Sequence, residues 1–397
     1  MTGAQSLCHL PGCRTQHSAN RDFVNAHARG PHARSGVPNA RERDAPFRTA
    51  KTCARVVGGY LRLGAFGSTT RFANVKAIRI HQQGAIDVMQ YTDVELPPPP
   101  PGHVQVRHES IGVNFIDTYH RSGLYPLRLP SGLGMEAAGV VEALGDGVTQ
   151  FAAGDRVAFC SGAIGAYAQA SNAPAARVVK LPADVSFDVA AAVMLKGLTV
   201  QYLLRQTYAV SAGETILFHA AAGGCGLIAC AWAKHLGVRM IGTASSAEKL
   251  ALAQANGCAE VINYRTDAVP AKVKELTDGK GVPVVYDGVG KDTFMMSLDC
   301  LAPRGLLVSF GNASGPVTGV DLGILAAKGS VYVTRPTLAT YAASSEQLQA
   351  MAAELWSLVG LGVIKGDISQ RYPLADAAVA HRDLQGRATT GSILLVP

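Results

Sequence analysis

The chain has 397 residues, enough for two or three domains, and its 48% hydrophobic and 16% charged residues are ordinary for a globular protein. This composition excludes a chain that is disordered, collagenous or coiled-coil throughout. The net charge of +7 comes from the N-terminus, because residues 1–73 hold 11 of the 36 Lys and Arg residues and only three of the 29 acids. The rest is close to neutral and predicts no basic surface for nucleic acid.

Residues 1–74 mix Arg, His, Gly, Pro and Ala without apolar periodicity, which predicts a disordered basic extension outside the fold. No secretory apolar core lies near Met1. Two origins stay open: an organellar transit peptide, or an upstream extension such as one from a misassigned start codon, which is favoured. The pattern of a compact fold begins at Val75.

Residues 75–196 predict a β-rich domain, a compact and partly open barrel. A run of five prolines, Pro97–Pro101, indicates a rigid surface loop. Short strands are expected at Val75–His81, Val104–Ile111, Gly139–Leu144 and Arg156–Phe159, with turns at Gly145–Gly147 and Ala153–Asp155.

From about residue 197 the pattern alternates between strand and helix, which is typical of a parallel, doubly wound sheet. The expected strands are 214–220, 238–243, 260–264, 282–287 and 305–310, and the expected helices are 224–236, 247–256 and 268–277. An amphipathic helix at 345–361 and a last strand at 391–396 follow, and we expect this tail to return to the first domain.

Two further patterns exclude classes of protein. The eight cysteines contain no C-x-x-C pair and are scattered, which indicates reduced thiols in a cytosolic protein rather than a disulfide framework or a zinc lobe. The uncharged stretch 215–233 could mimic a membrane span, but a His and a run of glycines interrupt it. A buried strand, a turn and a buried helix are expected there, and no transmembrane segment.

The most informative stretch runs from Ile216 to Ala229, where an apolar strand enters a turn of small residues and a helix begins. Read as G-x-G-x-x-G, its glycine positions are Ala221, Gly223 and Gly226. Small residues let backbone N–H groups approach a pyrophosphate, and the helix N-terminus favours its negative charge. A tight turn without a ligand is the alternative, but the strand–turn–helix context favours a dinucleotide site.

The end of the next strand favours NADP(H) over NAD(H). NAD enzymes place an acid there, against the ribose hydroxyls. This chain has Thr243-Ala244-Ser245-Ser246 instead, with Lys249 one turn into the following helix. Hydroxyls and a cation suit a 2′-phosphate; the alternative for Lys249 is a solvated surface lysine.

Several long motifs appear in one order, and the region 75–397 that carries them resembles the zinc-independent quinone oxidoreductases of the medium-chain dehydrogenase/reductase superfamily, the group that includes zeta-crystallin. It is most similar to the bacterial NADPH:quinone oxidoreductases. The motifs are residues 112–119 (GVNFIDTY), 121–125 (RSGLY), 195–200 (LKGLTV), the glycine turn, 308–312 (VSFGN) and 332–336 (YVTRP).

The resemblance implies an α/β fold with a GroES-like β-rich catalytic domain at 75–197, a Rossmann NADPH-binding domain at 198–335, and a C-terminal return at 336–397. It implies NADPH as the cofactor, bound between the two domains. The implied cofactor-binding residues are Phe115, Ile116, Asp117, Thr118, Tyr119, Tyr202, Gly224, Cys225, Ser245, Lys249, Tyr264, Gly288, Val289, Phe310, Gly311, Asn312, Ala313, Arg335, Pro336, Thr337 and Arg387. Cys225 departs from the Val that is usual in the family, which adds sensitivity to oxidants.

A zinc alcohol dehydrogenase is the first alternative to exclude. Zinc-dependent relatives carry Gly-His-Glu and a catalytic Cys, whereas this chain has Gly134-Met135-Glu136 and, near the Cys position, Asn114. Met is a poor zinc ligand beside the imidazole it replaces. The four clustered cysteines of a structural zinc lobe are absent too, so we expect no metal site.

Without a metal, the expected chemistry is direct hydride transfer from the nicotinamide to an electron-poor quinone. Tyr125, Tyr119 and Asn114, in that order, are the candidates for stabilising the developing oxyanion, with cofactor packing as the alternative for each. No second glycine-rich motif implies a flavin.

Two other functions stay open: an NADPH-dependent reductase of α,β-unsaturated carbonyls, and a non-enzymatic NADPH-binding protein like a crystallin or an RNA-binding relative. The neutral body argues against RNA. The resemblance also implies a homodimer or homotetramer in the cytoplasm.

Overall fold

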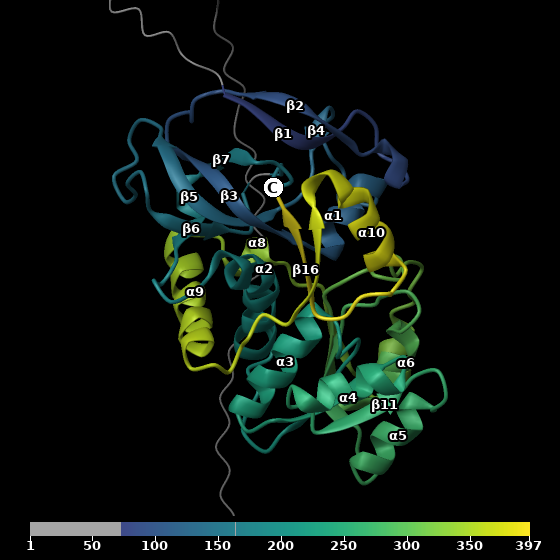
Figure 1. Cartoon of the computed structure of the whole chain (residues 1–397). Helices are drawn as coiled ribbons and strands as arrows, with labels where there is room; N and C mark the ends of the chain where they lie inside the picture. Colours follow the sequence, from purple (N-terminus) through teal and green to yellow (C-terminus); the bar gives the residue numbers. More distant parts are fainter. Residues whose placement is uncertain (1–72, 163) are drawn as a thin grey trace, which may run out of the picture. The chain divides into compact units, whose positions relative to one another are not determined.

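The computed structural model describes residues 73–162 and 164–397 (Figure 1). The predicted extension lies outside the described residues, apart from Ala73 and Asn74, which begin the first strand. The first strand among the described residues therefore begins two residues before the expected Val75.

The first half of the described chain is built on antiparallel strands, as predicted. The sequence of β3 explains this arrangement. Val104 and Val106 on this strand are fully buried, whereas Arg107, the next residue along it, is exposed to solvent. The strands form a sheet in the order β2-β1-β4 and a larger one in the order β15-β16-β3-β5-β6-β8, with β7 paired to β3. The elements are β1 (Ala73–Ile80), η1 (Ile86–Val88), β2 (Gln90–Leu96), β3 (His103–Val113), β4 (Ser131–Gly132), β5 (Glu136–Leu144), β6 (Arg156–Phe159), β7 (Ala170–Pro174), η2 (Ala175–Arg177) and β8 (Val178–Lys180).

Two helices in this half escaped the sequence analysis: α1 (Phe115–Ser122) and α2 (Phe187–Tyr202), which continues as η3 (Leu203–Thr207). Helix α1 is only eight residues long, too short for a clear period. Helix α2 is buried on most of its circumference, so its sequence shows no polar face. The helical segment 187–207 is long and apolar enough to cross a membrane. However, 78% of its apolar 18-residue window is buried inside the protein, as in a core helix.

The second half contains the predicted parallel sheet, in the order β11-β10-β9-β12-β13-β14 with every pair parallel. Most element ends agree with the expectation to within two residues. Strand β13 begins four residues earlier, because an irregularity in register lets it pair with β12 from Leu301 onward. The elements are β9 (Thr215–Phe218), α3 (Gly224–His235), β10 (Arg239–Ala244), α4 (Ala247–Ala255), β11 (Glu260–Asn263), α5 (Val269–Leu276), β12 (Val282–Asp287), α6 (Phe294–Asp299), β13 (Leu301–Ser309), α7 (Gly323–Ala327) and β14 (Tyr332–Thr334).

The C-terminal segment rejoins the antiparallel part of the fold. Its elements are α8 (Leu338–Tyr341), α9 (Ser345–Gly360), β15 (Ile368–Pro373), η4 (Leu374–Asp376), α10 (Ala377–Gln385) and β16 (Ser392–Val396). Strand β16 pairs antiparallel with β3, and both lie in the upper half of Figure 1. On its way there the chain passes the glycine turn, where Gly391 donates to the carbonyl of Ala222 at 3.0 Å.

A buried histidine in the antiparallel part makes stability depend on pH. The Nδ1 of His108 lies 2.7 Å from the carbonyl of Ala168 and its Nε2 3.0 Å from the Ser171 hydroxyl. Burial lowers the pKa of His108 to about 4. In the unfolded chain His108 binds a proton below about pH 6.5, whereas in the folded chain it does so only below about pH 4. Its contribution to the free energy of unfolding is therefore fully present above pH 6.5 and is lost as the pH falls toward 4.

We expect the free energy of unfolding to fall by about 3 kcal/mol between pH 7 and pH 4 because of His108 alone. Urea denaturation of His108→Gln should show a correspondingly shallower decline than the wild type. His81→Gln, at an exposed position, is the matched control, and its free energy of unfolding should depend on pH as that of the wild type does. Equal slopes in all three proteins would contradict this assignment.

Candidate active site

The glycine turn joins β9 to α3 and leaves backbone donors uncapped. Ala220 adopts a positive φ of 55°, and Gly223 donates to its carbonyl at 3.0 Å. A Cβ at Gly226 would collide with that same carbonyl oxygen, so only glycine fits. Gly223 precedes α3 without capping it through a side chain. The first-turn N–H groups are therefore available to an anion, which fits the pyrophosphate of a dinucleotide.

At one side of the turn, adjacent parallel strands bring the predicted 2′-phosphate residues together. Ser245 follows β10, Tyr264 follows β11, and the Tyr264 N–H donates to the Ala244 carbonyl at 3.1 Å. Lys249, in the first turn of α4, reaches the C-terminal segment and donates to the carbonyl of Arg387 at 2.7 Å.

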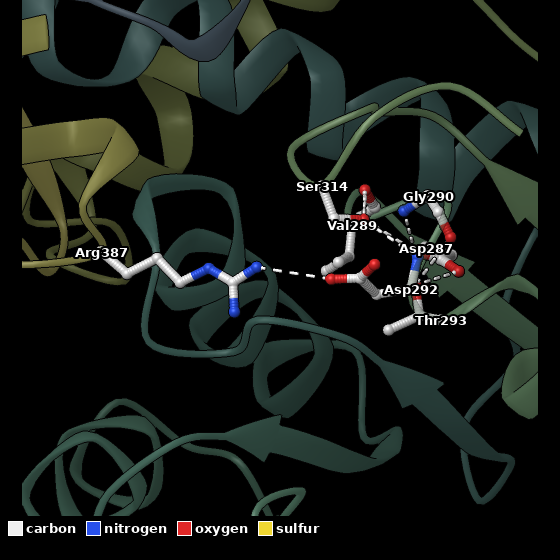
Figure 2. Close-up of polar contacts among 7 residues, drawn as sticks. All are labelled: Asp287, Val289, Gly290, Asp292, Thr293, Ser314 and Arg387. Atoms are coloured by element: carbon white, nitrogen blue, oxygen red, sulfur yellow. Dashed lines mark hydrogen bonds and ion pairs between the residues drawn. The ribbon is translucent and has the colours of Figure 1, made fainter. Parts of the chain in front are cut away.

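Arg387 crosses toward the end of β12. Its guanidinium lies 3.7 Å from the Asp292 carboxylate, as Figure 2 shows. Both side chains are about half exposed, so this ion pair is weak and can open. Lys249 thus places one cation beside the end of β10, which carries no acid, and the backbone of Arg387 lies against it while the Arg387 guanidinium reaches Asp292.

The ends of β12 and β13 lie close to each other on the other side of the glycine turn. Asp287, almost fully buried, accepts from the N–H groups of Val289 (2.8 Å) and Gly290 (3.0 Å) and from the Thr293 hydroxyl (Figure 2). It also accepts from the Ser297 hydroxyl at 2.8 Å. This network holds the loop 288–290 rigidly. A Cβ at Gly288 would lie 2.9 Å from the ring of Phe310, and one at Gly311 would strike the Gly288 carbonyl. Glycine at both positions therefore lets the two predicted strand ends pack directly against each other.

A polar cluster links helix α1 to this region. The N–H of Asn312 donates to Tyr119 Oη at 3.0 Å, and Arg335 Nη2 donates to Tyr125 Oη at 3.1 Å. The Asn312 amide, oriented so that both its polar atoms are satisfied, accepts from Arg335 at 3.2 Å and donates to the Gly311 carbonyl at 3.0 Å. Burial raises the pKa of Tyr119 to about 12.

The tyrosine rings also contact each other. The ring centroids of Tyr119 and Tyr125 are 5.2 Å apart in an edge-on arrangement. The structure therefore brings two of the three predicted oxyanion residues together, with Arg335 and Asn312 as their partners.

The third predicted residue, Asn114, lies apart from the tyrosines. Its side-chain N–H donates to Glu136 Oε2 at 2.8 Å, and the residue is 5% exposed. Asp117 likewise points inward: its Oδ2 accepts from the Asn114 N–H and the Tyr167 hydroxyl, each at 2.8 Å. Burial raises the pKa of Asp117 to about 7. Both side chains hold α1 in place, and a direct role toward a ligand stays a prediction for each.

The remaining predicted residues occupy the surroundings of the turn. Tyr202 stacks on Tyr341 with ring centroids 4.7 Å apart, and Thr337 precedes helix α8. Thr118 donates to the Phe115 carbonyl at 2.7 Å. Cys225 lies in the first turn of α3, where burial raises the pKa of its thiol to about 11. Ala313 donates to the Gly288 carbonyl at 3.3 Å, whereas no contact among the described residues assigns a specific role to Ile116 or Pro336.

One buried ion pair beside the glycine turn was missed. Lys196 Nζ lies 3.3 Å from Glu136 Oε2, with side chains 8% and 0% exposed. Glu136 also accepts from the Leu195 N–H at 2.6 Å. The Lys196 chain covers Gly224 so closely that a Cβ there would lie 2.7 Å from it. A lysine inside an otherwise apolar segment was the available signal.

An antiparallel β domain followed by a parallel sheet, with a glycine turn after its first strand and basic residues after its second, defines a medium-chain dehydrogenase/reductase. Family models agree: "Alcohol dehydrogenase GroES-like domain" matches residues 100–183 and "Zinc-binding dehydrogenase" matches residues 224–357. Among the described residues, no group of three or more His, Cys, Asp or Glu side chains could hold a metal ion.

Comparison with individual relatives identifies the family to which the chain belongs within this superfamily. A quinone oxidoreductase of Pseudomonas aeruginosa is 59% identical over 323 residues, covering 81% of this chain and 99% of the relative. The structure of Escherichia coli quinone oxidoreductase complexed with NADPH is 53% identical, with a TM-score of 0.80, covering 81% of this chain and all of that one. A 2-haloacrylate reductase of Burkholderia is 45% identical, covering 81% of this chain and 99% of the relative. The chain therefore belongs to the quinone oxidoreductase family, which confirms the predicted resemblance and fold class.

Proposed function

We propose that this protein is an NADPH-dependent quinone reductase that transfers a hydride directly from the nicotinamide to a quinone. The observation that carries the proposal is one continuous arrangement: a basic pair at Lys249 and Arg387, the uncapped glycine turn, and the cluster of Tyr119, Tyr125 and Arg335. Relatives named quinone oxidoreductases at 54–59% identity support it.

The residues of this site include groups suited to each part of NADPH, from the 2′-phosphate to the nicotinamide ring. Ser245, Lys249 and Arg387 would hold the 2′-phosphate, and the first turn of α3 would hold the pyrophosphate. The nicotinamide ring would lie beside the tyrosines, near the strand ends that meet at Gly288 and Gly311. When bound, the cofactor supplies the hydride.

The protein's own part in the reaction is to bind, orient and stabilise charge. Arg335 donates to Tyr125 Oη, so the hydroxyl proton of Tyr125 is left to donate, either to the Asn312 amide oxygen 3.3 Å away or to a substrate oxygen that takes its place. The guanidinium also strengthens that donor while negative charge develops on the oxygen. Tyr119, which accepts from the Asn312 N–H, is fixed in the same way.

Replacing Tyr125 with Phe should lower kcat with a quinone about 100-fold, the loss typical of one oxyanion donor, while the affinity for NADPH stays the same. Steady-state kinetics and fluorescence titration with NADPH measure the two quantities. Tyr91→Phe, at an exposed position, is the matched control. Unchanged turnover in Tyr125→Phe would remove this residue from the mechanism.

The 2-haloacrylate reductase relative favours a second candidate, reduction of an α,β-unsaturated carbonyl or carboxylate. The two candidates share fold and hydride donor, and the acceptor pocket decides between them. Oxidation of NADPH is followed with a 1,4-quinone, an alkenal and 2-chloroacrylate, each repeated with NADH. We expect rapid oxidation of NADPH with the quinone. Turnover with the other acceptors alone would select the second candidate, and tight NADPH binding without any turnover would indicate a binding protein.

We further propose a homodimer that uses strand β14. This strand pairs with β13 and has no neighbour on its outer side among the described residues. Its Tyr332 and Val333 are 61% and 38% exposed, and an unpaired apolar edge favours pairing with a second copy. Light scattering of the purified protein distinguishes monomer, dimer and tetramer.

The remaining expectations are also proposals. We infer zinc-independent chemistry, because Met135 and Asn114 stand where the zinc-dependent relatives have metal ligands, and the Asn114 amide donates to Glu136. We infer a soluble cytoplasmic enzyme with functional domains at 75–197 and 198–335 and a C-terminal return at 336–397. The near-neutral charge of the body supports a small-molecule substrate rather than nucleic acid.

A further inference from the structure

We propose that Cys230 and Cys258 form a reversible disulfide on oxidation by a hydroperoxide, and that this disulfide weakens NADPH binding. The two thiols lie behind the glycine turn, outside the set of residues assigned to the cofactor or the substrate. They are 28 positions apart in the sequence, so only the fold brings them together.

The geometry places both sulfurs at one crossing of the chain. Cys230, on α3, has its Sγ 3.7 Å from the Ala221 carbonyl. Cys258, after α4, has its Sγ close to Gly242 of β10: a Cβ added there would lie 2.7 Å from that sulfur and 2.6 Å from the Ala221 Cβ. Gly257 is equally close to α3, since a Cβ there would lie 3.1 Å from the Cys230 carbonyl.

The two thiols influence each other, and their surroundings make them unequal. Interaction with Cys258 and burial raise the pKa of Cys230. Interaction with Cys230 lowers the pKa of Cys258, whose thiol donates to the Met240 and Glu260 carbonyls at 3.3 and 3.1 Å. Cys258 therefore ionises first, and Cys230 is the resolving thiol beside it. Both residues are buried, at 0% and 5% exposure, so the oxidant must be small.

The chemistry balances with one hydroperoxide. The Cys258 thiolate attacks a peroxide oxygen, the O–O bond breaks, and Cys258 becomes a sulfenic acid while hydroxide leaves. Cys230 then attacks the Cys258 sulfur, the S–O bond breaks, and water forms with the Cys230 proton. Two thiols are oxidised and one hydrogen peroxide is reduced to two waters. Hydroquinones that autoxidise in air generate this oxidant, so the class of reaction proposed above supplies it.

A disulfide would act on the cofactor through Ala221. This residue lies in the glycine turn: its Cβ packs against Gly242, beside the Cys258 sulfur, and its carbonyl lies 3.7 Å from the Cys230 sulfur. A disulfide requires the sulfurs to approach to about 2.05 Å, closer than any contact between thiols. Drawing α3 and the end of α4 together therefore displaces the turn whose N–H groups hold the pyrophosphate.

The test uses the full chain treated with hydrogen peroxide and digested with trypsin under conditions that block free thiols. We expect one cross-link, between the peptide 206–234 and the peptide 250–265, which dithiothreitol removes. The first peptide also holds Cys225, so Cys225→Val should keep the cross-link and Cys230→Ala should lose it. Absence of the cross-link in the wild-type protein, or its loss in Cys225→Val alone, would overturn the proposal.

Binding of NADPH is measured on the same samples. We expect the Kd of the oxidised protein to rise at least 10-fold and to return after dithiothreitol. Cys258→Ala and Cys258→Ser should keep the basal quinone reductase activity and lose the response to peroxide. A cross-linked protein that binds NADPH as tightly as the reduced one would overturn the link to the cofactor.

Discussion

Replacing Lys249 with Ala will lower kcat/KM for NADPH by about 10- to 100-fold, because a charge-assisted hydrogen bond to a phosphate contributes about 1.5–3 kcal/mol. Its Nζ already lies at the strand end that lacks an acid, held by the Arg387 carbonyl at 2.7 Å. The value for NADH, which has no 2′-phosphate, should change by less than about threefold. Steady-state kinetics with both cofactors measures the two effects.

Lys272→Ala provides the matched control. Lys272 lies on α5 and pairs with Glu275 at 2.8 Å on the exposed surface, so both cofactors should be used as by the wild type. Arg387→Ala should show the same selective loss as Lys249→Ala. Equal losses for NADPH and NADH in Lys249→Ala would instead indicate a general structural defect and reject the 2′-phosphate role.

Replacing Lys196 with Met will lower the free energy of unfolding by about 3 kcal/mol or more, because it leaves the fully buried Glu136 without its counter-charge. Two neutral donors, the Asn114 amide and the Leu195 N–H, remain on that carboxylate and keep the loss near the lower end of the range. Urea denaturation measures the change.

Two further variants separate this effect from a general loss of charge. The double variant Glu136→Gln with Lys196→Met removes both charges and should recover much of the stability. Lys180→Met breaks the exposed pair with Asp155, 2.8 Å long, and should cost less than about 1 kcal/mol. A Lys196→Met variant no less stable than Lys180→Met would show that the buried pair contributes little.

Local chemistry explains what could be predicted of the fold. The parallel sheet followed from apolar runs that alternate with helices ended by glycine, such as Gly237 and Gly257, whose φ angles of 71° and 107° suit few other residues. Helix α2 could not be predicted in the same way. Its burial on nearly all sides removes the polar face by which a helix is recognised in a sequence.

The sequence by itself determined the nucleotide turn and the choice of NADPH, because each depends on residue types within about 30 positions of one another: small residues at 220–226, and Ser245 and Lys249 in place of an acid. Tertiary structure alone decided the partners of the candidate catalytic groups. Tyr125 meets Arg335 across 210 positions, and Glu136 meets Lys196 across 60. It also paired the Asn114 amide with Glu136. Such contacts join residues on elements far apart in the sequence, and no local pattern in the chain encodes how those elements pack.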